Sequence, residues 1–212
     1  MQAKPSGTKS PANHRPRTKP ADVRLNELMN AAQALFLEKG VDATTVSDIV
    51  NAADVAKGTF YHYFPSKNEM LAALGSRYTE HFLARVEQAV GSCAEDDWAG
   101  RLRTWIRANV ETYVDTYRIH DIVYTNHHHH DRSNQDKNAI LEQLLGIIEG
   151  GISAGLWAPA QPRVVALLIY SGVHGATDDV IAAQTNNYTP FADSVADACL
   201  HMLTTPASGQ SR

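Results

Sequence analysis

The segment DVAKGTFYHYFPSKNEM, residues 54–70, concentrates side chains that suit contact with a nucleic acid. Lys57 supplies positive charge, and Gly58 leaves room for a phosphate to approach the backbone closely. Tyr61 and His62 carry flat rings with polar tips, which can reach base edges, thymine methyl groups or sugars. Residues 55–68 hold two bases and no acid, so their charge favours an anionic partner.

Two residues at predicted helix starts could grip a phosphate, namely Thr45 and Lys67. A purely structural role is disfavoured for Lys57, Gly58, Tyr61 and His62 taken together. Burying all four would leave several polar atoms without hydrogen-bond partners. At Tyr63, packing in the core and contact with DNA remain equal alternatives.

A run of histidines lies in NHHHHDRSNQD, residues 126–136. If the preceding helix continued, His120, His127 and Asp131 would share one stripe with Tyr124, and this stripe could hold zinc, nickel or cobalt. A biased histidine tract is only a compositional signal. A solvated loop between helices is the alternative, and so is hydrogen bonding of these histidines to a small molecule.

Aromatic side chains in the second half of the chain could line a ligand pocket. Such a pocket, with few charges, suits a small, largely apolar or aromatic molecule. The candidates are Trp105, Tyr113, Tyr117, Tyr124, His127, Tyr170 and His174.

The sequence favours no enzyme. It shows no nucleophile–histidine–acid constellation, phosphate loop or zinc-protease motif. Cys93 and Cys199 have no metal or redox spacing, which suits a reducing cytoplasm. We expect no resident cofactor, and a small-molecule effector or a divalent metal are the ligands left open.

These groups must be positioned by helices, because apolar residues recur at helical spacing and no alternating strand pattern appears. The pattern predicts an all-α chain of 212 residues with these helices: 22–38, a short one after the Thr45–Asp48 cap pair, 56–63, one capped by Ser66 and Glu69 and reaching Val90, 96–118, 119–126, 133–154, 160–184 and 190–204.

Charge is distributed unevenly along the chain. Residues 1–20 hold five Lys/Arg and no acid, whereas the whole chain has a net charge of −4. No apolar run approaches the roughly 18 residues of a membrane span, and the N-terminus lacks the apolar stretch of a secretory signal. We therefore expect a cytoplasmic protein. The basic end suits a polyanion partner, and a solvated, disordered tail is the alternative that charge alone favours.

Two short helices joined by a tight turn are typical of the helix-turn-helix motif. The stretch TTVSDIVNAADVAKGTFYHYFPSKNEML, after AAQALFLEKGVDA, resembles the DNA-binding domain of the TetR family of transcriptional regulators over about residues 22–75. One departure is Asp54, where the family often has glycine; aspartate tolerates a left-handed backbone, so we expect the turn to form.

The resemblance implies a division of the chain and a set of contacts. It implies a basic arm over 1–21, a DNA-binding domain over 22–68, an effector-binding and dimerisation domain over 69–205 and a flexible tail over 206–212. Arg17 in the arm could follow a groove or phosphates. The implied DNA contacts are Thr45, Lys57, Thr59, Tyr61, His62, Tyr63 and Lys67. Gly58 is a further predicted contact, because it lets a phosphate approach the backbone.

The last two predicted helices carry apolar faces wider than one small domain needs, and in the family such helices form a four-helix bundle between two subunits. Packing within one chain is the alternative. The expected homodimer residues are Val165, Leu168, Gly172, Ala176, Phe191, Val195 and Met202.

Together these features predict a repressor that binds a palindromic operator in double-stranded DNA as a homodimer and is released by a small effector. One alternative is a metal-responsive regulator that uses His120, His127 and Asp131. The others are a metal-dependent enzyme, an activator, and an architectural protein that binds no small molecule.

Overall fold

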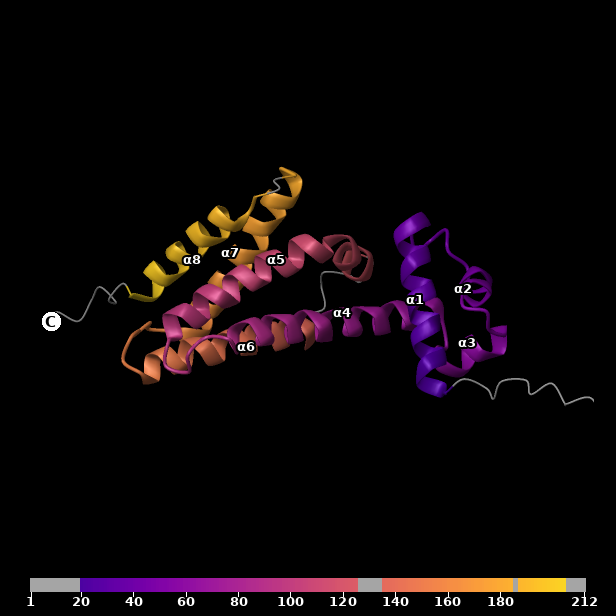
Figure 1. Cartoon of the computed structure of the whole chain (residues 1–212), viewed down its shortest axis with the longest axis horizontal. Helices are drawn as coiled ribbons and strands as arrows, with labels where there is room; N and C mark the ends of the chain where they lie inside the picture. The colour runs from indigo at the N-terminus through magenta and orange to yellow at the C-terminus, as the bar shows by residue number, and fades with distance from the viewer. Residues whose placement is uncertain (1–19, 126–134, 185–186, 205–212) are drawn as a thin grey trace, which may run out of the picture.

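The computed structural model describes residues 20–125, 135–184 and 187–204. These residues form helices without any strand, as the apolar spacing predicted (Figure 1). The helices are α1 (Ala21–Lys39), α2 (Val46–Ala52), α3 (Lys57–Tyr63), α4 (Lys67–Val90), α5 (Trp98–Thr125), α6 (Gln135–Ser153), α7 (Pro162–Ala182) and α8 (Thr189–Thr204).

The first three helices enclose a small apolar core of their own. Phe36 of α1, Ile49 of α2 and Phe60 of α3 are each 1% exposed or less. Phe64, in the loop after α3, joins the same core. Burying one such side chain contributes roughly 1.5–3 kcal/mol to folding, so these contacts hold the short helices in place.

Helix α4 connects this small core to a larger one (Figure 1). Met70, Leu71 and Leu74 on its first turns belong to the N-terminal core, whereas Phe82 and Val86 belong to the second. The N-terminal core therefore extends past residue 68 along α4. It also includes Val123 from the end of α5.

The second core lies among α4, α5, α6, α7 and α8. Trp105 of α5, Leu144 of α6 and Ile169 of α7 are buried at its centre. Close packing around it requires a glycine at Gly151, where a Cβ atom would stand 2.1 Å from the Trp157 ring. This core gives the helices that follow α4 a fixed frame.

The structure corrects the prediction of two helices over 96–118 and 119–126. One helix, α5, runs from Trp98 to Thr125. The sequence across the predicted break, TYRIHDIV, contains no glycine or proline, so nothing interrupts the backbone hydrogen bonds. The cap at the start of α4 is also simpler than predicted: the Ser66 side chain accepts from the Glu69 N–H at 3.2 Å, and between these two described residues the reciprocal bond is absent.

Candidate nucleic-acid interface and ligand region

The turn between α2 and α3 adopts the left-handed conformation that an aspartate was expected to tolerate. Asp54 has φ 52°. The N–H of Val55 donates to the Val50 carbonyl at 3.0 Å, and Ala53 is buried in the turn. These contacts set the angle at which α3 leaves α2.

Helix α3 divides its side chains between the core and the surface as the spacing predicted. Phe60 is fully buried, whereas Tyr61 is 51% exposed. Lys57, Gly58 and His62 are also exposed. A Cβ atom built on Gly58 would meet no atom of the described residues within 4 Å, so among these residues the surface beside it is open to an approaching backbone.

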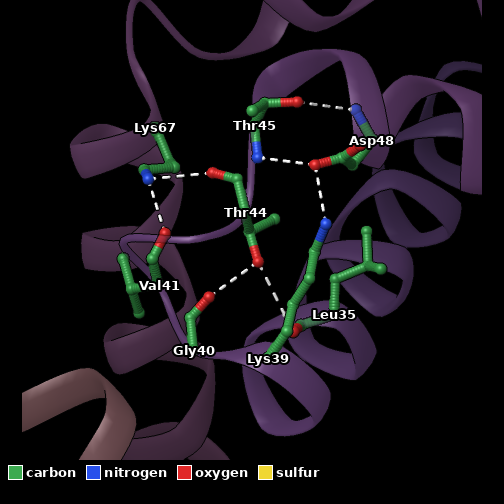
Figure 2. Close-up of polar contacts among 8 residues, drawn as sticks. All are labelled: Leu35, Lys39, Gly40, Val41, Thr44, Thr45, Asp48 and Lys67. Carbon is green, nitrogen blue, oxygen red and sulfur yellow. Dashed lines mark hydrogen bonds and ion pairs between the residues drawn. The ribbon is translucent and has the colours of Figure 1, made fainter.

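Thr45 begins α2 with a complete capping box (Figure 2). Its hydroxyl oxygen accepts from the Asp48 N–H at 3.1 Å, and its own N–H donates to the Asp48 carboxylate at 2.9 Å. The hydrogen bond from Lys39, with these Thr45 bonds, lowers the pKa of Asp48 to about 2. Because the Thr45 oxygen accepts in this box, its O–H remains able to donate.

Lys67, predicted to bind a phosphate, already donates two of its three ammonium N–H groups to backbone carbonyls of the chain itself. Its ammonium donates to the carbonyl oxygens of Val41 at 2.5 Å and Thr44 at 2.9 Å (Figure 2). The Thr44 hydroxyl in turn donates to the Gly40 carbonyl at 2.7 Å. Lys67 thus fastens the loop before α2 to the start of α4.

Other predicted DNA contacts are less exposed. The hydroxyl of Tyr63 donates to the Ala21 carbonyl at 2.9 Å, and the side chain is half-buried, which favours the structural alternative for this residue. Thr59 is also half-buried. Arg17 lies outside the described residues.

The predicted aromatic pocket residues come together only in part. Tyr113 stacks on His174 with ring centroids 4.8 Å apart, and Tyr170 stacks on the same histidine at 6.3 Å. His120 lies 4.7 Å from Tyr113 and 5.0 Å from Tyr124. We call these five residues of α5 and α7 the aromatic cluster.

Two of the predicted pocket residues are not part of this cluster. Trp105 is fully buried in the second core, and its indole N–H donates to the Gln143 side chain at 2.9 Å. Tyr117 is 36% exposed on the surface of α5. His127 lies outside the described residues. Helical spacing shows that a residue can face inward, but not which neighbour it will meet.

Burial and charge determine the electrostatics of the aromatic cluster. Burial raises the pKa of Tyr113, helped by the hydrogen bond that its hydroxyl donates to Asp178 at 2.8 Å. Burial also lowers the pKa of His120, against the opposing hydrogen bond to Asp121. The cluster therefore favours a neutral imidazole at His120.

The predicted metal stripe gains no support from the structure. Over the described parts of the chain no group of three or more His, Cys, Asp or Glu side chains could hold an ion. His120 instead belongs to the aromatic cluster. His127 and Asp131 lie outside the described residues.

The face proposed for dimer contacts is exposed on the single chain. Leu168 of α7 is 55% exposed and Met202 of α8 is 43% exposed, and Gly172 between them in sequence is exposed as well. Val165, Ala176, Phe191 and Val195 are half-buried. Val164 and Leu167, which belong to the same apolar face of α7, are 45% and 37% exposed.

A cleft that no sequence pattern indicated opens where α1, α4 and α5 meet, with a volume of about 350 Å³. It is lined by Asn30 and Gln33 of α1, by Arg77, Tyr78, His81, Phe82 and Arg85 of α4, and by Thr112, Thr116 and Ile119 of α5. Its residues are far apart in sequence, so a local signal could not have found it.

Residues 28–74 match the family described as bacterial regulatory proteins of the tetR family. The repressor KstR2 of Mycobacterium tuberculosis is 29% identical over 143 residues, which is 64% of this chain and 70% of KstR2. The fold resembles PfmR of Thermus thermophilus, with a TM-score of 0.64 and 22% identity over 83% of this chain and 98% of PfmR. It also resembles Bacillus subtilis FadR in complex with stearoyl-CoA, with a TM-score of 0.65 and 20% identity over 85% and 97% of the two chains.

Proposed function

We propose that this chain, whose residues 28–74 match the tetR family of bacterial regulatory proteins, is a transcriptional repressor of that family. In this proposal a homodimer binds a palindromic DNA operator, and a small, largely apolar or aromatic effector releases it. The single observation that carries the DNA-binding part is the outward display of Lys57, Tyr61 and His62 by a helix whose Phe60 is fully buried.

The proposed DNA contacts divide by chemistry. Tyr61 and His62 would read base edges and thymine methyl groups in the major groove, whereas Lys57 and the hydroxyl of Thr45 would bind phosphates. Gly58 would let the duplex approach α3 closely, since its surroundings are open. The rigid attachment of α3 through Phe60 and Phe64 supports this role, because a reading helix must keep its orientation.

The proposed homodimer would bury the apolar face of α7 and α8. Helix α7 is long and apolar enough to span a membrane by length and composition, yet only 28% of its apolar window is buried inside one chain. A second copy seated on Leu167, Leu168 and Met202 would remove this surface from water. Two-fold dimers are the commonest soluble assemblies, and such a dimer would place two α3 helices roughly 34–36 Å apart.

The proposed effector acts through the domain that follows α3. The partial convergence of the predicted pocket residues into the aromatic cluster supports a ligand with a flat or apolar body. The name of KstR2 identifies it as a repressor, and FadR was solved with stearoyl-CoA, which supports regulation by a small organic molecule here. An effector that binds two global states unequally would shift the spacing of the α3 helices.

The test is selection of operator sequences from random duplex DNA by the full-length protein, followed by affinity measurements on the selected site. Tyr61→Ala should weaken binding about tenfold or more, as expected for loss of a base contact worth roughly 1–3 kcal/mol. Tyr117→Ala, at an exposed tyrosine on α5, is the matched control and should bind like the wild type. Failure to enrich any palindrome, or equal losses in both variants, would contradict the proposed function.

A further inference from the structure

The cleft between α1, α4 and α5 joins two parts of the molecule. Asn30 and Gln33 come from α1 of the N-terminal core, whereas Phe82 comes from the second core. Figure 1 shows α1 beside the first turns of α4. A molecule bound in this cleft would touch both parts at once.

Arg77 places a partly desolvated cation in the cleft. Its guanidinium donates to the Asn30 side-chain oxygen at 2.9 Å and to the Gln33 side-chain oxygen at 2.8 Å. Both partners are neutral amides, and no carboxylate pairs with Arg77 among the residues that the structure describes. Burial lowers the pKa of Arg77. A negatively charged group beside this partly buried cation would stabilise it.

The second arginine of the cleft is already neutralised. Arg85 donates to the Asp115 carboxylate at 2.7 Å, and Glu111 lies 3.7 Å from the same nitrogen. Of the two arginines that line the cleft, Arg77 is therefore the one that can pair with the carboxylate of a bound acid. A guanidinium has five N–H donors, so donors remain on Arg77 after its two amide bonds.

Thr112 supplies an independent sign of a missing partner. The residue is 3% exposed, it lines the cleft, and its hydroxyl oxygen is buried without a hydrogen-bond partner among the residues that the structure describes. Thr116 and Thr177, by contrast, bond the carbonyls four residues before them at 2.6 and 2.7 Å. A buried hydroxyl without a partner is costly and rare, which points to a ligand atom at this position.

We propose that this cleft binds a small organic acid. The carboxylate pairs with Arg77, the Thr112 hydroxyl bonds a carboxylate oxygen or a second polar atom, and the apolar body packs on Phe82 and Ile119. The volume of about 350 Å³ is at the lower end of ligand sites, so the acid is compact. Binding does not depend on the proposed function, whereas an effect on DNA through Asn30 and Gln33 rests on it.

The experiment measures ligand binding to the full chain without DNA. Benzoate, 3-phenylpropionate and hexanoate are titrated by calorimetry and thermal shift, beside their uncharged amides and inorganic phosphate. At least one acid should bind and raise the melting temperature. The affinity of its amide should be lower by about tenfold or more. Phosphate, which has no apolar body, should give no shift. Binding of phosphate alone, equal binding of acid and amide, or no shift with any acid would overturn the proposal.

Two variants test the assigned groups. Arg77→Gln should weaken the acid about tenfold or more, whereas Arg103→Gln, which removes a surface pair with Asp197 on α8, should leave it unchanged. Thr112→Val keeps the Arg77 bonds, so it tests the site even if Arg77→Gln fails to fold. It should weaken the acid without lowering the melting temperature of the free protein. Unchanged affinity in Thr112→Val would overturn the proposed site.

The effect on DNA is measured separately with the selected operator. The bound acid should change operator affinity, and the operator should change acid affinity by the same factor. An acid that binds the cleft but leaves operator affinity unchanged would overturn the coupling to DNA and leave the binding site standing. Absence of any operator would instead contradict the proposed function and not the site.

Discussion

The ammonium of Lys67 lies 2.9 Å from the backbone oxygen of Thr44, twenty-three residues earlier in the chain. It also bonds the Val41 carbonyl, so one cation caps two carbonyls of the loop that leads into α2. This loop carries Thr45, which begins α2. Lys67 therefore helps to hold α2 in the orientation from which α3 follows.

Replacing Lys67 with alanine should destabilise the protein rather than remove a phosphate contact. Two carbonyls would lose their donor, at a cost of about 1–3 kcal/mol, measured as the free energy of unfolding in urea. The salt dependence of operator binding should stay close to that of the wild type. Lys57→Ala is the comparison: it should barely change stability and should reduce the slope of log affinity against log salt by about 1. The reverse pattern would restore Lys67 as the clamp.

Replacing Gly58 with alanine should separate stability from DNA binding. The methyl group would meet no atom within 4 Å in the part of the chain that the structure describes, and alanine is the better helix former by up to about 1 kcal/mol. Its melting temperature should therefore equal or exceed that of the wild type. Operator affinity should fall, because the methyl group occupies the surface that the duplex approaches. An unchanged operator affinity would show that DNA does not approach α3 at this glycine.

Replacing Leu168 with glutamate should convert the proposed dimer into a monomer. Its side chain is 55% exposed on α7 and belongs to the proposed interface, where an unpaired charge is costly to bury. The mass in solution is measured by light scattering after gel filtration. Leu156→Glu is the matched control, since Leu156 is 52% exposed in the turn after α6; it should keep the wild-type mass. A Leu168→Glu protein with an unchanged mass would place the interface elsewhere.

The protein should lose stability as the pH falls below about 6.5, the ordinary pKa of histidine, because of His120. Burial lowers the pKa of this residue in the folded chain, with His174 adding to the effect and Asp121 and Asp178 opposing it. Below the pKa of the unfolded chain the unfolded state binds more protons, so stability falls with pH. The melting temperature between pH 7.5 and 5.5 should decline less steeply in His120→Gln. His81→Gln, at an exposed histidine of α4, should keep the wild-type slope, and an equal slope in His120→Gln would contradict the assignment.

The sequence alone determined the features that depend on near neighbours in the chain. The cap pair of Thr45 and Asp48 forms as predicted, because its members are three residues apart at a helix start. The inward face of α3, with Phe60 opposite Tyr61, follows from helical spacing. The left-handed turn at Asp54 follows from the tolerance of aspartate for that conformation.

Tertiary structure decided the features that bring distant residues together. Helical spacing shows that Trp105 and Tyr113 face inward, but only packing places Trp105 in the apolar core and Tyr113 against His174 of α7. A lysine seen in a sequence can face solvent, bind DNA or donate to a backbone carbonyl. In the folded chain, Lys67 donates to two backbone carbonyls. Arg77 beside Asn30 exists as a site only because α1 packs across α4. Local periodicity determines which way a side chain points, whereas the partner that it meets depends on how whole helices pack.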